Sequence, residues 1–154
     1  MAVKCLMIMS LLLFSVGCKG KTRDPLDASY RKLREVPHEK WDALAQKKIF
    51  FGHQSVGRNI IDGLEKVLKS FPEIRLEIKE TADPRDLQRP VFAHSRIGRN
   101  REPEGKIDNF RQILESGIGQ AADVAFFKLC YVDIDQSTKI EDLIDHYDKT
   151  MEEL

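Results

Sequence analysis

The fold is decided by the stretch Ile49-Phe50-Phe51-Gly52-His53-Gln54-Ser55-Val56, which joins an apolar run to an amphipathic segment. The run Ile49-Phe50-Phe51 follows a charged residue and ends at Gly52, as expected of a short strand that is buried on both faces of a sheet. From Val56 to Ser70 apolar residues recur at helical spacing, and Pro72 stops the pattern. These residues predict a β-strand that leads directly into an α-helix.

The same alternation continues along the chain. We expect further strands at 74–78 and from Val124 to about Ile134, and further helices around 107–114 and 140–151. The polar segment Thr81 to Pro103 is expected to be a long connection. Strands that alternate with helices imply a parallel sheet with right-handed crossovers. The sequence therefore predicts an α/β fold of three layers, α/β/α, with three parallel strands, which we expect to be the N-terminal part of a larger domain.

Residues 1–17 have the pattern of a secretory signal peptide. Lys4 precedes the apolar run 6–16, and the small residue Gly17 stands before Cys18. The run is too short to span the ~30 Å hydrocarbon core of a bilayer. Ser15-Val16-Gly17-Cys18 resembles the signal of bacterial lipoproteins, and this resemblance implies an acylated Cys18, export, and a lipid anchor in the cell envelope. Ordinary secretion with an incidental Cys18 is the alternative.

The mature chain is expected to have two parts. Residues 18–36 are rich in charge and are predicted to be a spacer behind the lipid anchor, with the α/β domain at 37–154. By resemblance to Gram-negative lipoproteins, Lys19 favours the outer membrane if the host has one. Cys130 then has no intramolecular disulfide partner, which is typical of a small core residue.

The composition excludes some classes of protein. Lys and Arg number 25, Asp and Glu number 25, and the formal net charge is zero. Without a summed positive field, electrostatic capture of nucleic acid is not supported. Apolar residues make up 42% of the chain, which indicates a packed core rather than disorder.

Ser55 is the residue on which a functional prediction rests. Ligands of parallel sheets gather beyond the carboxyl ends of the strands, so the loops that begin at Gly52 and Leu129 should face the site. A serine at a strand-to-helix junction can present its hydroxyl to a substrate, with the free N–H groups of the helix below it to stabilise an oxyanion. The alternative is that Ser55 caps the helix through its side chain.

Three segments carry a resemblance to the SGNH (GDSL-type) hydrolases. The first is 52–57, Gly-His-Gln-Ser-Val-Gly, in which Ser55 stands where that family has its catalytic serine and Gln54 replaces an aspartate. The loop 95–100 resembles the second block, and 127–134 resembles the third, with Cys130 and Val132 in place of the family's glycine and asparagine. The fourth block, Asp-x-x-His, is absent from this chain.

The resemblance implies roles for individual residues. Ser55 would be the nucleophile, and the N–H of Gly98 would join that of Ser55 in binding the oxyanion. Gln54, Arg96 and Asn100 would contact the substrate. The catalytic His and Asp are expected in sequence beyond Leu154. No metal and no cofactor is implied.

Within the chain itself, two histidines are candidates for a substitute base. They are His53, two residues from Ser55, and His94, which precedes the expected oxyanion loop. A structural hydrogen bond at a turn is the alternative role for His53. Arg96, Arg99 and Arg101 form a basic cluster that can clamp a carboxylate or sulfate of a substrate, or simply make up a solvated loop.

Two functions from different classes follow. The first is a lipid-anchored serine esterase that removes an acyl group from a small molecule, glycan or lipid outside the cytoplasm. The second is a non-catalytic surface lipoprotein that binds glycan or protein through the same cleft, which Gln54, Val132 and the missing base favour. A truncated fragment that does not fold stably is a third interpretation.

Overall fold

The computed structural model describes residues 25–154 of the chain, and these fall into two units, the first ending at Glu35 and the second spanning 36–154. In the first unit the helix α1 (Pro25–Arg34) occupies part of the segment that we expect to be a spacer. The predicted signal peptide and Cys18 lie outside the described residues, so lipidation stays a prediction. Within residues 25–154, no helix has both the length and the apolar character needed to cross a bilayer.

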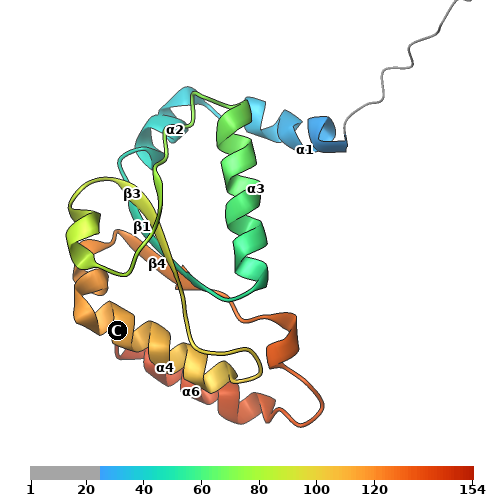
Figure 1. The fold of residues 1–154 in the computed structure, drawn as a ribbon, viewed down its shortest axis with the longest axis vertical. Coiled ribbons are helices and arrows are strands. Elements are labelled where there is room, and N and C mark those ends of the chain that lie inside the picture. The colour runs from blue at the N-terminus through green and yellow to red at the C-terminus, as the bar shows by residue number, and fades with distance from the viewer. Residues whose placement is uncertain (1–24) are drawn as a thin grey trace, which may run out of the picture. The chain divides into compact units, whose positions relative to one another are not determined.

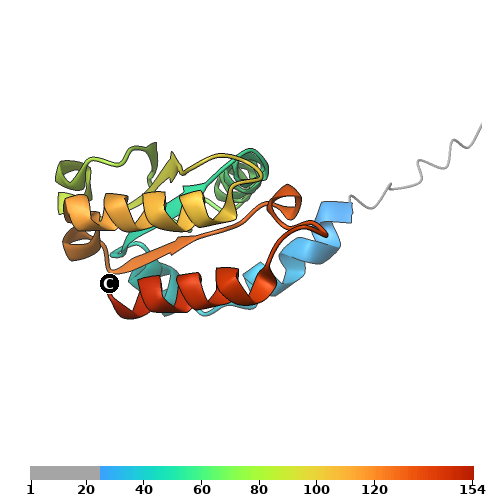
Figure 2. The same cartoon turned by 90° about the horizontal axis from the view of Figure 1, so that it is seen from below.

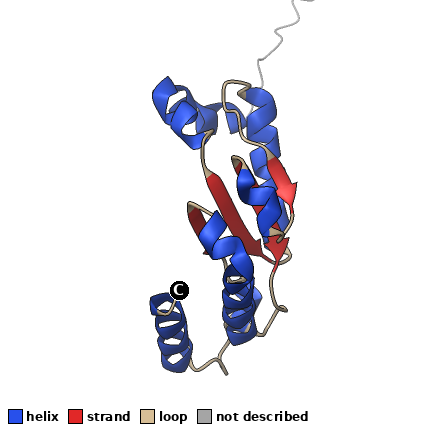
Figure 3. Ribbon diagram, turned by 90° about the vertical axis from the view of Figure 1, so that its left-hand side faces the viewer, coloured by secondary structure: helices blue, strands red, loops and turns tan. Residues whose placement is uncertain are grey.

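The second unit is built on a four-stranded sheet, and its strands are all parallel (Figure 1). In spatial order the strands are β2 (Ile78–Glu80), β3 (Val91–Arg96), β1 (Lys48–His53) and β4 (Val124–Phe127). The strands alternate in the chain with helices, and Figure 3 distinguishes the two by colour. The α/β prediction is confirmed.

One face of the sheet is covered by α2 (His38–Leu44) and α3 (Val56–Ser70). Ile49 and Phe51 of β1 pack there with Ile61 of α3, and Leu44 of α2 joins the same cluster. These contacts fix where α3 begins relative to the end of β1.

The opposite face is covered by α4 (Pro103–Ile113) and α6 (Ile140–Glu152), which run side by side (Figures 1 and 2). Phe50 of β1 packs with Phe110 of α4, and Met151 of α6 lies against the same cluster. Between α4 and β4 the chain makes a π-turn, Leu114–Ile118, and the short helix α5 (Gly119–Ala121). Helices on both faces confirm the three-layer architecture.

The strand β3 contradicts the expectation of a long connection at 81–103. Val91, Phe92 and Ala93 are buried, and β3 lies between β2 and β1 in the sheet. Its second half is polar because it forms the edge where the site lies, and this polarity hid the strand in the sequence. The sheet therefore has four strands rather than three.

Two other strands are shorter than expected. The strand expected at 74–78 is formed only at Ile78–Glu80, and Ile74 is instead a buried core residue in the preceding turn. The strand expected to reach Ile134 ends at Phe127, and a 3-10 turn at Tyr131–Asp133 follows it. Ile74 and Cys130 are buried and anchor the respective turns without joining the sheet, whereas Tyr131 and Ile134 are exposed.

The topology creates a crevice at the carboxyl ends of the two central strands, β1 and β3. β1 and β3 are neighbours, and their carboxyl ends lie side by side because Gly52 pairs with Ser95 and His53 with Arg96. The chain leaves β1 for α3 on one face and leaves β3 for α4 on the other. A divergence of this kind opens the space in which α/β proteins bind ligands.

Candidate functional site

Ser55 stands at the turn between β1 and α3 in a strained conformation. Its side chain is exposed, its φ is +32° and its ψ is −92°. A residue with a Cβ rarely adopts a positive φ, and such strain gathers at functional sites. A nucleophilic serine held on a sharp strand-to-helix turn has this kind of backbone.

The helix-cap role of Ser55 is wrong, because its side chain makes no capping hydrogen bond to α3. The first backbone bonds of the helix run from Gly57 N to Gln54 O and from Arg58 N to Ser55 O. Within the described residues no acceptor is found for the N–H groups of Ser55 and Val56. Two unpaired amides thus lie at the N-terminus of a 15-residue helix, beside an exposed hydroxyl.

A pocket of about 420 Å³ opens beside Ser55. Four of its lining residues were singled out in the sequence, namely His53, Gln54, Ser55 and Arg96. The other two, Arg58 and Glu80, were missed by sequence reasoning. Arg58 lies in the first turn of α3 and Glu80 ends β2, and neither was singled out as a site residue in the sequence. Arg58 Nη1 lies 3.7 Å from Glu80 Oε2, and Arg58 Nε lies 3.0 Å from Asp62 Oδ1.

His53 and His94 form a buried pair. His53 Nε2 and His94 Nδ1 are 3.0 Å apart, and each residue is 2% exposed. The His53 ring lies directly under the first turn of α3, because a Cβ on Gly57 would approach His53 Cγ to 2.5 Å. His53 Nδ1 is buried without a hydrogen-bond partner in the described part of the chain. One of these two nitrogens donates its N–H to the other, so the tautomer of one ring determines the tautomer of its partner.

Burial lowers the pKa of both histidines. For His53 desolvation is the largest cause, and the neighbouring His94 and Arg96 act in the same direction against Glu80. For His94 desolvation again dominates, with Glu80 opposing it. Both rings are therefore neutral at pH 7 and able to accept a proton, but no hydrogen bond joins either of them to Ser55. Their role as a substitute base stays a prediction.

Both backbone polar groups of Gly98 are already hydrogen-bonded. Its N–H, which we expected to face an oxyanion, donates to Asn109 Oδ1 of α4 over 3.0 Å. Its carbonyl accepts a hydrogen bond of 2.7 Å from Gln54 Nε2. In this conformation Gly98 is not a free oxyanion donor, and Gln54 ties the β1–α3 turn to the β3–α4 loop.

Gly98 is nevertheless required by packing. Its φ is +49°, and a Cβ there would lie 2.9 Å from the backbone N of Lys106. The third predicted substrate residue, Asn100, lies outside the pocket, and its Oδ1 accepts a hydrogen bond of 3.1 Å from Lys106 Nζ. Asn100 thus braces the loop in this structure.

A buried ion pair connects the loops at this end of the sheet to α4. Lys106 Nζ lies 2.5 Å from Asp133 Oδ2, and both side chains are fully buried. Asp133 also accepts hydrogen bonds from the N–H of Arg101 at 2.8 Å and of Cys130 at 2.6 Å. Burial by itself would raise the pKa of Asp133, but these three donors lower it. The pair joins α4 to the loops after β3 and β4.

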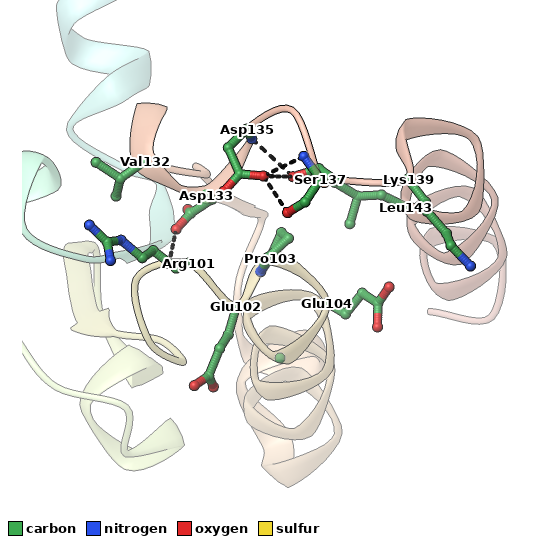
Figure 4. Close-up of a pocket in the computed structure, with 12 residues that line it drawn as sticks. Arg101, Glu102, Pro103, Glu104, Val132, Asp133, Asp135, Ser137, Lys139 and Leu143 are labelled. Atoms are coloured by element: carbon green, nitrogen blue, oxygen red, sulfur yellow. Dashed lines mark hydrogen bonds between the residues drawn. The ribbon is translucent and has the colours of Figure 1, made fainter.

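Two residues of the third SGNH-like segment lie near this ion pair. Cys130 is 2% exposed, and its Sγ lies 3.8 Å from the backbone oxygen of Gln54. Val132 lines a second pocket of about 540 Å³, between the start of α4 and the start of α6 (Figure 4). Asp135 closes its rim by accepting hydrogen bonds from the N–H and the hydroxyl of Ser137. Four acidic and two basic residues line this second pocket, and Ser55 is not among its lining residues.

Among residues 25–154 no cluster of three or more His, Cys, Asp or Glu side chains is arranged to hold a metal ion. Comparison of the chain with protein-family models, with curated proteins and with solved structures gives no match. The function must therefore be argued from the site.

Proposed function

We propose that the protein is a serine ester hydrolase of the SGNH type that acts outside the cytoplasm, with Ser55 as the nucleophile. The observation that carries the proposal is the exposed hydroxyl on a positive-φ turn, with no capping bond, beside a polar pocket. A strained conformation that serves no helix cap is best explained by the presentation of Ser55 Oγ to a ligand.

The reaction would proceed through an acyl-enzyme. Ser55 Oγ forms a bond to the ester carbonyl carbon while its proton passes to a base. The negative charge that develops on the carbonyl oxygen would meet the N–H groups of Ser55 and Val56 and the positive end of the α3 dipole. The alcohol leaves with a proton, and water then hydrolyses the acyl-enzyme.

Among the described residues the candidate proton acceptor is His53. His53 is neutral, lines the pocket and has an unpaired nitrogen, but its Nε2 is engaged by His94. The acyl donor is proposed to be a small molecule, a glycan or a lipid.

A fluorophosphonate probe tests whether Ser55 is nucleophilic. We expect labelling of the wild-type protein, loss of labelling in Ser55→Ala, and retention in Ser70→Ala, a matched change of an exposed serine at the end of α3. Hydrolysis of 4-nitrophenyl acetate should follow the same order. Equal labelling of the two variants would remove Ser55 from the mechanism.

A second function is favoured by the occupied N–H of Gly98 and by the absence, in the described residues, of a base bonded to Ser55. In this alternative the protein is a surface lipoprotein that binds glycan or protein in the same cleft without cleaving it. Binding that survives Ser55→Ala, together with no probe labelling of the wild type, would select it.

The lipid anchor is proposed separately, from the sequence around Cys18. Cells that express the protein and are fed an alkynyl fatty acid should incorporate it into the wild type. We expect the same in Cys130→Ser, whose thiol is buried, but not in Cys18→Ser. Incorporation that persists in Cys18→Ser would contradict the anchor.

A further inference from the structure

The arginines of residues 36–154 fall into two groups. Those of the first group form ion pairs with carboxylates: Arg58, Arg75, Arg85, Arg89 and Arg111. Those of the second group are Arg96, Arg99 and Arg101, and no ion pair or side-chain hydrogen bond is found for them among the described residues. All three unpaired guanidinium groups therefore belong to the end of β3 and the loop that follows it.

Only one of the three unpaired arginines reaches the pocket of Ser55, and this is Arg96. The pocket also contains Arg58, whose charge is offset by Asp62 and by Glu80. Glu80 is the one carboxylate among the residues that line it. Arg58 is thus engaged by two carboxylates, and Arg96 is the positively charged residue of the pocket whose guanidinium group has no carboxylate partner among the described residues.

The neighbouring groups strengthen this positive character. The N-terminus of α3, with the unpaired N–H groups of Ser55 and Val56, points its partial positive charge at the same space. An arginine that is unpaired in such surroundings is suited to bind a carboxylate, phosphate or sulfate through two parallel hydrogen bonds.

We propose that Arg96 binds a negatively charged oxyanion group of the ligand in the pocket of Ser55. Resting on the proposed esterase function, this makes Arg96 a specificity-determining residue that favours esters carrying a carboxylate, phosphate or sulfate over neutral esters. Arg99 lies outside the pocket and Arg101 lines the other one, so neither shares this role.

The binding arm of the test does not depend on catalysis. Ser55→Ala protein is titrated with inorganic phosphate, sulfate and acetate at constant ionic strength, and the backbone amide signals around residues 55–57 are followed by NMR. We expect a saturable shift. Arg96→Gln should weaken the affinity by about 10-fold or more, because a charge-assisted hydrogen bond is lost.

Arg99→Gln is the matched control, since it removes the same charge from the same loop outside the pocket. It should change the affinity by less than about 2-fold, because Arg99 does not line the pocket and its charge is screened from the ligand by solvent and salt. Equal weakening by the two variants, or no saturable shift in the parent protein, would overturn the assignment to Arg96.

The kinetic arm compares two substrates of equal chain length. One is the 4-nitrophenyl half-ester of a dicarboxylic acid, and the other is the corresponding ester with a methyl end. Arg96→Gln should lower the ratio of kcat/KM for the anionic to the neutral ester by about 10-fold, and Arg99→Gln should leave the ratio unchanged. A ratio unaffected by Arg96→Gln counts against the proposal, whereas hydrolysis that is insensitive to Ser55→Ala counts only against the esterase function.

Discussion

The backbone of Ser55 can be tested by comparing glycine with alanine at this position. A residue with a Cβ in a sparsely populated region such as φ +32°, ψ −92° is strained by about 1–3 kcal/mol. Glycine has no Cβ and reaches this region readily, although its freer unfolded chain costs about 0.5–1 kcal/mol. The difference predicts that Ser55→Gly is more stable than Ser55→Ala by about 1 kcal/mol.

The loss of the hydroxyl itself should have little effect on stability. Ser55 Oγ is exposed and makes no capping bond to α3. Surface substitutions of this kind change the free energy of unfolding by about 0.5 kcal/mol or less. Ser55→Ala should therefore lie close to the wild type, with Ser55→Gly above both, while both variants lose probe labelling.

Urea unfolding followed by far-UV circular dichroism measures this difference. With an m-value of about 1–3 kcal/mol/M for a domain of this size, 1 kcal/mol shifts the midpoint by about 0.3–1 M. Asn59 provides the control, because it is exposed within α3. There glycine should be less stable than alanine by about 1 kcal/mol, which is the opposite order.

The reasoning is refuted if glycine is no more stable than alanine at position 55 while the Asn59 pair behaves as expected. Such a result would mean that Ser55 is not held at a positive φ in solution. The turn would then lack the strain on which the presentation of the hydroxyl is argued.

Other changes test the rest of the domain. Asp133→Asn should destabilise it by about 3–5 kcal/mol in urea unfolding, because the fully buried Lys106 loses its ionic partner; a loss below about 1 kcal/mol would contradict the buried pair. Gly63→Ala should stabilise by about 0.5–1 kcal/mol, because an added Cβ on this helical residue meets no atom within 4 Å, and a lower urea midpoint would argue against that packing. The lowered pKa values of His53 and His94 mean that the unfolded chain binds protons more readily below pH 6.5. The contribution of the two neutral histidines to the free energy of unfolding should be complete above this pH. It should fall as the pH drops below it, by at most about 1.4 kcal/mol per pH unit for each ring. Replacing both histidines with Asn should flatten this pH dependence.

Apolar patterning located α3 and β1, but it misplaced β2, which was expected at 74–78 and forms at Ile78–Glu80. The apolar spacing in α3 gave its bounds at Val56 and Ser70, and the apolar run before it marked β1. The same criterion missed β3, because Val91–Arg96 is apolar in its first half and polar in its second. A strand that contributes half of its length to a polar site does not have the pattern of a core strand.

The candidate site was predictable in part for the same reason. Ser55, Gln54 and His53 follow directly from the end of β1, so a local argument places them at the functional edge. Arg58 follows Ser55 by one helical turn, so the predicted helix already brings it near, whereas Glu80 enters the pocket only because β2 joins the same sheet as β1. No local pattern reports the position of Glu80.

By itself the sequence determined the α/β class, the strand-to-helix junction at Ser55 and the edge at which a ligand would meet the domain. Only the tertiary structure decided the hydrogen-bond partners: His53 pairs with His94, 41 residues away, and Gly98 gives its N–H to Asn109 rather than to an oxyanion. It also left Arg96 unpaired in the pocket. The physical reason is that local spacing reports which face of a segment is buried, whereas the order of the strands and the side of each crossover determine which polar groups meet.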